Sequence, residues 1–334
     1  MVTDARRACH WTLLRLAGRL PDGLLTASRR LLAQGGHTAM ARLVTLAVAG
    51  RDIPLHRDDL RCLGELLDGA EPPAPLGDPA PGDPMPRHRF FAARPFPGTR
   101  TDRIDQAAVA ACRAEPDARG LWRAWRVPAD DGHQTAKPVF VVETDADPAG
   151  LAGRMQDRLT TAGELYPQVE TYETGAWLPA YQRSARGAGE LLWSRTPDPG
   201  VRIAPLPDEF LGIGPSDWGD TEPIENDEER IRILSYLDAG SPVLITTARL
   251  HDVIDQDLGR VVPMSFRTDG AWIWTDISAY YLRTYGLSPG RDLVAHVTAN
   301  GYRMPEVDGV AEFRAISVLY RAEEEDATAG GRLR

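Results

Sequence analysis

Residues 139–172 read VFVVETDADPAGLAGRMQDRLTTAGELYPQVETY, and this stretch decides the fold class. The opening run VFVV is short, apolar and β-branched, which is typical of a buried strand. A helical segment follows over 148–162, with Asp147 placed as its N-cap and Gly163 after its end. The closing run VETY predicts a second strand. The stretch therefore predicts a strand, a helix and another strand in succession.

Similar elements flank this stretch on both sides. The spacing of apolar residues predicts a helix over 104–114 and a strand over 120–127 before it. After it, a helix that begins near Pro179 is expected to span 178–192. This order favours one small sheet covered by helices. We therefore expect the α+β fold class.

The organisation of the chain changes along its 334 residues, a length sufficient for two or three domains. Apolar stripes at helical spacing predict an N-terminal helical bundle, followed by two small mixed α/β parts. Seven prolines between residues 72 and 86 exclude a helix or a central strand from the segment after the bundle. The predicted order is a helical bundle at 1–70, a Pro-rich linker at 71–100, a small α+β domain at 101–195, an acidic linker at 196–225, a C-terminal α+β domain at 226–322 and a frayed tail at 323–334.

The C-terminal part carries a hairpin signal. Asp269-Gly270 stands between apolar runs at 261–266 and 271–274, and an Asp-Gly pair in that position is typical of a tight β-turn. A further strand is expected at 243–246. The helices expected in this part cover 228–238, 278–285, a segment from Ser288-Pro289 to 300, and 310–319.

Charge is distributed unevenly along the chain. The net charge is −10, yet residues 1–62 hold ten arginines against five acidic residues, a local charge of +5. The remainder therefore carries −15. An acidic average disfavours non-specific binding of nucleic acid. The basic start keeps open an anionic partner, or nucleic acid, bound through the N-terminal helices.

The composition excludes several chemistries. The three cysteines are widely spaced and form no C-x-x-C pair, so each is expected to be a free buried thiol. Lys137 is the only lysine and has no glycine-rich loop beside it, which argues against Schiff-base and Walker-type chemistry. The acids that follow His251 match no calcium-loop spacing. We expect no metal site and no cofactor.

The same composition indicates where the protein works. The apolar stretch at 11–20 is interrupted by Arg15 and Arg19, so it does not resemble a secretory signal. No run of 18 apolar residues occurs in the sequence, so no membrane association is expected. The free cysteines agree with a reducing compartment. We expect a cytoplasmic protein.

The densest candidate site is aromatic. Trp272 and Trp274 alternate with Ile273 on a strand, so both indoles face the same side. That face is either core or a binding surface. Core is the favoured interpretation, and the exposed side of the next helix is then the interface. The candidate binding residues of this part are Arg267, Asp269, Trp272, Trp274, Tyr281, Arg283 and Tyr285. A second, weaker cluster contains Tyr181 and Arg183.

Two stretches resemble known protein groups. The segments VETY at 169–172, LPAYQ at 178–182 and LLW at 191–193 are similar to the N-terminal domain of the enhanced-serine-sensitivity proteins, over about 119–193. That resemblance implies a small α/β domain without established catalytic residues. The segments TDGAWIW and AYYL resemble a part of uncharacterised actinomycete proteins of accessory or immunity type, over about 226–320.

These observations favour a binding or regulatory protein over an enzyme. The leading hypothesis is a cytoplasmic, non-catalytic protein of accessory or immunity type that acts through protein–protein contact. One alternative is a hydrolase that uses acidic residues near His251 and Asp269. The other is the binding of an anionic partner by the basic N-terminal helices.

Overall fold

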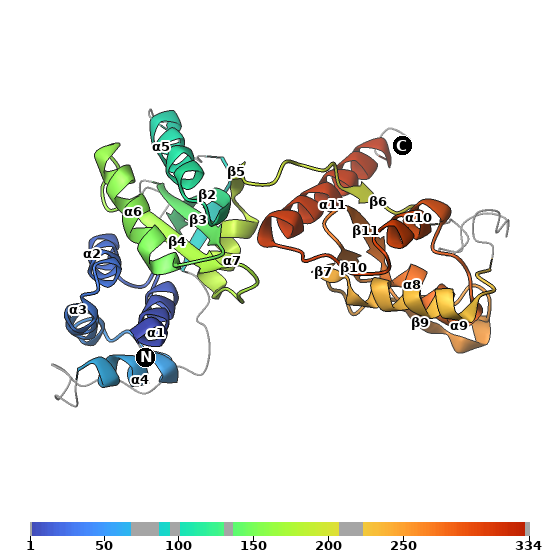
Figure 1. Ribbon diagram of the computed structural model, residues 1–334, viewed down its shortest axis with the longest axis horizontal. Helices are drawn as coiled ribbons and strands as arrows, with labels where there is room; N and C mark the ends of the chain where they lie inside the picture. The colour runs from blue at the N-terminus through green and yellow to red at the C-terminus, as the bar shows by residue number, and fades with distance from the viewer. Residues whose placement is uncertain (1, 68–86, 94–100, 130–135, 207–222, 331–334) are drawn as a thin grey trace. The chain divides into compact units, whose positions relative to one another are not determined.

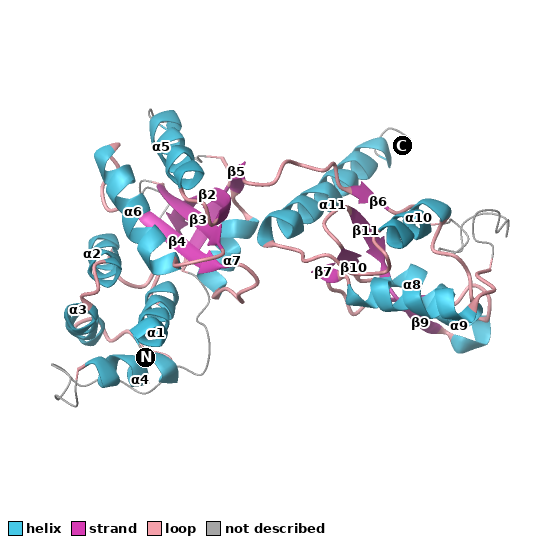
Figure 2. Ribbon diagram, viewed as in Figure 1, coloured by secondary structure: helices cyan, strands magenta, loops and turns pink. Residues whose placement is uncertain are grey.

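The computed structural model describes residues 2–67, 87–93, 101–129, 136–206 and 223–330. The chain divides into two compact units, Met1–Thr196 and Pro197–Arg334. Each unit combines helices with a sheet (Figures 1 and 2), which confirms the α+β class. None of the described helices is long and apolar enough to cross a membrane.

The first unit is built on one sheet. Its strands are β1 (His88–Phe91), β2 (Ala118–Pro128), β3 (Lys137–Thr144), β4 (Gln168–Glu173) and β5 (Glu190–Ser194). The order is β1-β2-β3-β4, and β5 pairs with β2 beyond the part that β1 occupies. β3 and β4 are parallel, and the other pairs are antiparallel.

The parallel pair is the strand-helix-strand unit predicted from 139–172. Helix α6 (Pro148–Thr161) joins β3 to β4. Asp147 caps this helix as predicted, because its Oδ1 accepts a hydrogen bond from Gly150 N at 3.1 Å. The helix ends before Gly163, which adopts a positive φ of 102°.

The two faces of this sheet are covered by different helices. Leu121, Val142 and Val169 point to one face and form a core with α5 (Thr101–Ala114) and α6. The next residues along the strands, among them Trp122 and Glu170, point to the other face, as strand alternation requires. Helix α7 (Ala180–Gly187) lies on that second face, since Gln182 donates a hydrogen bond to Glu170.

The N-terminal helices belong to the same unit as this sheet. They are α1 (Val2–Arg15), α2 (Asp22–Ala33), α3 (His37–Ala49) and α4 (Arg57–Leu66). His10 on α1 hydrogen-bonds the backbone carbonyl oxygen of Thr171 on the edge strand β4, at 2.7 Å. Arg29 on α2 forms a buried ion pair with Glu170, with 2.5 Å between Nη2 and Oε2. These contacts attach the helices to the β4 edge of the sheet.

Two sequence expectations in this unit need correction. The helix expected over 178–192 ends at Gly187, and β5 takes up the rest. The chain turns at Gly189 and then pairs with β2. The turn brings residue 189 so close to the end of α7 that an added Cβ would lie 2.8 Å from Ala185 O, which favours glycine there. The second correction is β1, an edge strand inside the segment expected to be a linker over 71–100. Residues 68–86 and 94–100 of that segment lie outside the described residues.

The second unit contains a small mixed sheet in the order β6-β11-β10-β7. These strands are β6 (Arg202–Ile203), β7 (Ser241–Leu244), β10 (Phe266–Thr268) and β11 (Trp272–Thr275). A separate hairpin joins β8 (Arg249–His251) to β9 (Arg260–Pro263), with the short helix η2 (Gln256–Leu258) between them. The helices are α8 (Asp227–Ala239), α9 (Asp276–Tyr285), α10 (Arg291–Ala299) and α11 (Gly309–Gly330).

The Asp269-Gly270 turn joins β10 to β11 as predicted. The strand expected over 261–266 is wrong as a single element, because β9 pairs with β8 while β10 pairs with β7 and β11. The helix expected from Ser288-Pro289 begins only at Arg291. Residues 288–290 form a turn instead, in which Gly290 N donates a hydrogen bond to Ser288 Oγ. Gly290 has a φ of 101°, which is not a helical conformation. Helix α11 continues past residue 319 to Gly330, into the expected tail, and residues 331–334 lie outside the described part.

Candidate anion-binding pocket

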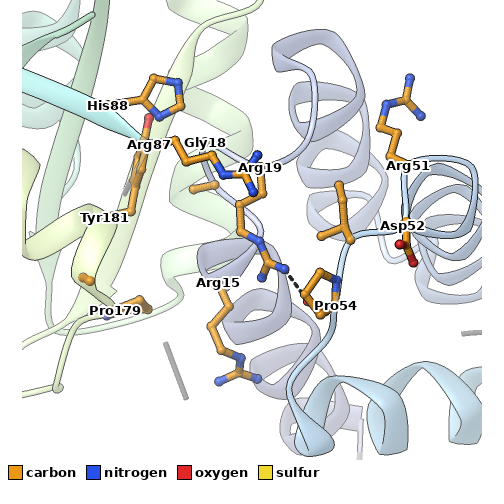
Figure 3. A pocket seen from close by; sticks show the side chains of 13 residues that line it. Arg15, Gly18, Arg19, Arg51, Asp52, Pro54, Arg87, His88, Pro179 and Tyr181 are labelled. Carbon is orange, nitrogen blue, oxygen red and sulfur yellow. Dashed lines mark hydrogen bonds between the residues drawn. The ribbon is translucent and has the colours of Figure 1, made fainter. Parts of the chain in front are cut away.

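A pocket of about 220 Å³ lies in the first unit. Three segments that are distant in sequence form it: the turn between α1 and α2, the loop between α3 and α4, and the start of β1. The beginning of α7 completes the wall through Pro179 and Tyr181 (Figure 3).

Arginine dominates the lining of this pocket. Arg15, Arg19, Arg51 and Arg87 contribute four positive charges, and Asp52 contributes the one carboxylate of the lining. Arg51 and Arg87 are exposed and have no carboxylate partner among the described residues. A pocket with this lining favours negatively charged ligands.

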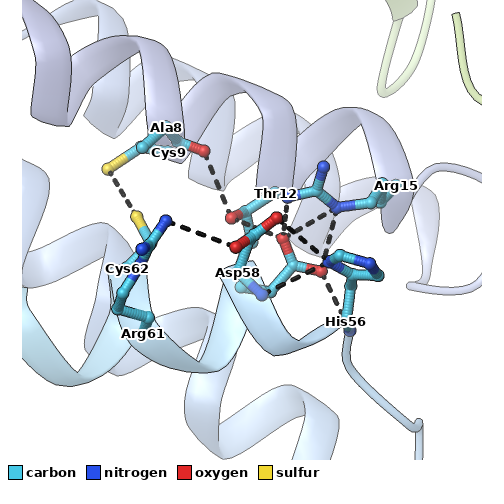
Figure 4. Close-up of polar contacts among 9 residues, drawn as sticks. Ala8, Cys9, Thr12, Arg15, His56, Asp58, Arg61 and Cys62 are labelled. Carbon is cyan, nitrogen blue, oxygen red and sulfur yellow. Dashed lines mark hydrogen bonds and ion pairs between the residues drawn. The ribbon is translucent and has the colours of Figure 1, made fainter. Parts of the chain in front are cut away.

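Two of the arginines are held in place by the fold. Arg15 ends α1 and is paired with the buried Asp59 on α4, with its Nε 2.9 Å and 3.1 Å from the two carboxylate oxygens (Figure 4). Arg19 reaches across the pocket and donates to the carbonyl oxygen of Pro54 (Figure 3). These anchors position guanidinium groups before any ligand arrives, which reduces the entropic cost of binding.

Gly18 sets the shape of the turn that carries Arg19. Its φ is +73°, a conformation that residues with a side chain rarely adopt. An added Cβ would also lie 2.4 Å from the ring of Tyr181. The α1–α2 turn therefore packs directly on α7, and a larger residue at this position would push the turn away from the pocket wall.

The neutral part of the wall consists of His88 and Tyr181. Burial, assisted by the nearby Arg126, lowers the pKa of His88 to about 4, so its imidazole is neutral at pH 7. Tyr181 is buried, and its hydroxyl accepts a hydrogen bond from Arg126 at 3.2 Å. Burial raises the pKa of Tyr181 to about 12. The charge of the pocket at neutral pH therefore comes from its arginines and carboxylates alone.

This lining suits the recognition of an oxyanion. Guanidinium groups stay protonated and present planar pairs of donors that match carboxylate and phosphate oxygens. They cannot act as general bases and do not bind metal cations. Among the described residues, no group of three or more histidine, cysteine or acidic side chains is arranged to hold a metal ion.

The residues singled out from the sequence are dispersed by the fold. Tyr181 lines the pocket, but Arg183 does not, and its guanidinium stacks over the exposed Trp177 ring at 4.6 Å. Trp272 and Trp274 lie in the core of the second unit, with 4% and 1% of their surface exposed. The two indoles therefore share one buried environment.

Arg267 and Arg283 have partners within the second unit. Arg267 donates to Asp276 at 2.7 Å and to the carbonyl oxygens that end α8. Arg283 forms two hydrogen bonds with Asp238, at 2.6 and 2.8 Å. Both arginines thus attach α8 to the elements packed against it.

Tyr281 and Tyr285 belong to a group that surrounds Asp252. One oxygen of Asp252 accepts from Tyr280 and Tyr285, both at 2.7 Å, and the other accepts two backbone amides. Tyr281 is buried, and its hydroxyl accepts from Val253 N at 3.1 Å. Burial of Asp252 acts to raise its pKa, but the hydrogen bonds outweigh this effect and lower it. The carboxylate therefore holds the loop after β8 against α9.

Asp269 is the centre of a second polar group. The sequence pattern indicated Asp269 but not its partners Tyr236 and His296. One of its oxygens lies 2.5 Å from both Tyr236 Oη and His296 Nε2, and the other accepts the amides of Ala271 and Trp272. Burial acts to raise the pKa of Asp269, but these hydrogen bonds prevail and lower it. The carboxylate joins the β10–β11 turn to α8 and α10.

The arginines of the pocket were not singled out individually by the sequence. The excess of arginine over residues 1–62 indicated the region, and Arg15, Arg19 and Arg51 belong to it. They share one pocket lining with Arg87 only because the start of β1 lies beside the α1–α2 turn, and no local sequence pattern indicates this placement.

Comparisons with protein-family models, with curated proteins and with solved structures found no match for this chain. The two resemblances stated from the sequence stay predictions.

Proposed function

We propose that this chain is a binding protein that recognises an anionic group on a protein partner at the arginine pocket. The observation that carries the proposal is that Arg15, Arg19, Arg51 and Arg87, which come from three separate segments, line one pocket. The proposal combines the hypothesis of protein–protein contact with the alternative of an anionic partner. It places the binding site in the N-terminal helical region, which supplies Arg15, Arg19 and Arg51.

The size and charge of the pocket favour a compact anion. The four arginines carry four positive charges, and Asp52 and Asp59 carry two negative charges, so the local charge is +2. A phosphate monoester, which carries about two negative charges at pH 7, would neutralise that charge. A nucleic-acid duplex would require a basic surface along its backbone, whereas the chain beyond residue 62 carries −15.

The test is a calorimetric titration of the full chain with inorganic phosphate and with a phosphoserine peptide. Arg51→Ala and Arg87→Ala are the informative variants because neither residue has a carboxylate partner in the described structure. A hydrogen bond to a charged group contributes about 1.5–3 kcal/mol, so each variant should weaken binding by about tenfold or more. The exposed Arg42 on α3 does not line the pocket, and Arg42→Ala is the matched control.

Equal affinity in all three variants would refute the pocket as the binding site. Binding of the peptide but not of free phosphate would support a protein partner, because the remaining contacts would then come from the peptide chain. Binding of neither ligand would overturn the proposal.

One observation favours the hydrolase alternative, namely the contact between Asp269 and His296. A buried carboxylate beside an imidazole is the arrangement by which hydrolases orient a base. His251 is exposed on β8 and makes no contact with Asp269 among the described hydrogen bonds. If the alternative holds, ester hydrolysis by the full chain must be lost in His296→Ala and kept in His251→Ala.

A further inference from the structure

Two of the three cysteines lie together although 53 residues separate them in sequence. Cys9 on α1 and Cys62 on α4 face each other with 3.7 Å between their sulfur atoms (Figure 4). Both side chains are buried. All three cysteines are free and buried, as expected from the sequence, and the fold brings two of them side by side.

The surroundings hold the two helices in register at this point. Thr12 and Arg15 on α1 both donate to Asp59 on α4, one turn before Cys62. The Thr12 Oγ1–Asp59 Oδ1 distance is 2.9 Å. Because these contacts fix the position of α4 against α1, the two sulfur atoms stay close in the folded chain.

The two thiols are not equivalent. The hydrogen bond between the sulfur atoms lowers the pKa of Cys62 and raises that of Cys9. Cys62 also keeps 6% of its surface exposed whereas Cys9 keeps none, so an oxidant reaches Cys62 first.

We propose that Cys9 and Cys62 form a reversible intrachain disulfide and make the α1–α4 interface a thiol-oxidation site. The sulfur atoms would have to approach from 3.7 Å to the bond length of about 2 Å, a shift within the reach of side-chain rotation and small helix movement. The proposal is independent of anion binding.

The oxidant is a low-molecular-weight disulfide such as glutathione disulfide. The Cys62 thiolate attacks one sulfur of it and expels one glutathione thiolate, which leaves a mixed disulfide on Cys62. Cys9 then loses its proton, attacks the Cys62 sulfur and expels the second glutathione. The protein loses two protons and two electrons, and the same two protons and two electrons convert one glutathione disulfide into two glutathione molecules.

Cys112 provides an internal control. It is buried against Met155 in the core that α5 and α6 form with the sheet, with 3.8 Å between the sulfur atoms, and it has no cysteine neighbour. Burial raises its pKa to about 12. It should remain a free thiol while the Cys9–Cys62 pair reacts.

The experiment incubates the native full chain with millimolar glutathione disulfide, then unfolds it in guanidinium chloride with iodoacetamide present to block the remaining thiols, and measures the intact mass. The expected product has one blocked thiol, has lost about 2 Da by oxidation and remains a monomer. Digestion should identify a peptide in which Cys9 is linked to Cys62. Reduction with dithiothreitol should restore three reactive thiols in the unfolded chain.

Cys112→Ser should oxidise like the parent, whereas Cys62→Ser should not form an intrachain bond. If Cys62→Ser fails to fold, the peptide map of the parent chain tests the proposal alone, through the presence or absence of the peptide that links Cys9 to Cys62. Three blocked thiols after incubation, a stable glutathione adduct, or a bond that includes Cys112 would each overturn the proposal.

Discussion

At the scale of single residues, His10 shows how the fold changes the chemistry of a side chain. The imidazole lies between α1 and the edge of β4, fully enclosed, with Nε2 at 2.7 Å from Thr171 O. Burial lowers its pKa from 6.5 to about 4, with smaller effects from Arg29 and Arg6 in the same direction. The folded chain therefore keeps His10 neutral under conditions in which the unfolded chain protonates it.

This difference predicts a pH dependence of stability. Between pH 6.5 and 4 the unfolded state binds more protons at His10, so the free energy of unfolding of the first unit falls as the pH falls. The full effect of His10 is about 3 kcal/mol, since one pKa unit corresponds to about 1.4 kcal/mol. Hydrogen exchange of the β3 and β4 amides at a series of pH values measures it.

His10→Gln keeps a donor for the Thr171 carbonyl oxygen and removes the titration, so it should flatten the pH dependence. His88 titrates in the same window because burial also lowers its pKa, and it should account for the slope that remains. The exposed His251 in the second unit gives the control variant His251→Gln. An unchanged slope in His10→Gln would contradict the assignment.

At the scale of elements, the β10–β11 hairpin shows where local patterns suffice. Alternation along the strand predicts that Trp272 and Trp274 share one side, and the structure buries both in the core with Tyr236 and Leu237 of α8. Trp274 Nε1 also donates to Leu237 O at 3.2 Å. The hairpin was predictable because its turn, its register and its buried face depend on adjacent residues.

Truncation of either indole should therefore destabilise the second unit. We expect Trp272→Ala and Trp274→Ala each to lower its free energy of unfolding by about 3–5 kcal/mol, because a large cavity is left in a packed core. Thermal unfolding followed by circular dichroism measures the change. Trp177→Ala is the control, since 77% of the Trp177 surface is exposed. Two core variants as stable as this control would mean that the indoles are not core residues.

The region 178–192 shows where local patterns fail. Helical spacing continues through Gly187, but the pairing of Glu190–Ser194 with β2 determines the structure after it. Strand pairing with a segment some seventy residues earlier is a tertiary interaction, and it overrides the weak helical preference. Gly189, which lies against the backbone of Arg123, is the one residue that hinted at the change.

At the scale of the whole molecule, the N-terminal helices form one compact unit with the first sheet. Arg29 and Glu170 are 1% and 0% exposed, and their ion pair joins α2 to β4 across 141 residues of sequence. Removal of one partner of such a pair leaves a buried charge without compensation. The helices of 1–66 are therefore bound to the sheet by contacts that do not depend on the segment connecting them.

Limited proteolysis tests this arrangement. The expected first cleavage site is the stretch 72–86, because its seven prolines have no backbone N–H to donate to a sheet. After the cut, we expect the N-terminal fragment to stay associated with the fragment that follows it. Size-exclusion chromatography without denaturant measures this association. Separate elution of two folded fragments would contradict the shared unit, and Glu170→Ala should weaken the association.

The sequence by itself determined the α+β class, the strand-helix-strand unit with its Asp147 cap, and the Asp269-Gly270 hairpin. Each depends on propensity, capping or alternation among neighbouring residues, which a single sequence carries. The tertiary structure alone decided which arginines line one pocket, that Cys9 lies beside Cys62, and that His296 contacts Asp269. Those groups assemble from segments tens of residues apart, and their meeting is set by how helices pack on a sheet, which local periodicity does not specify.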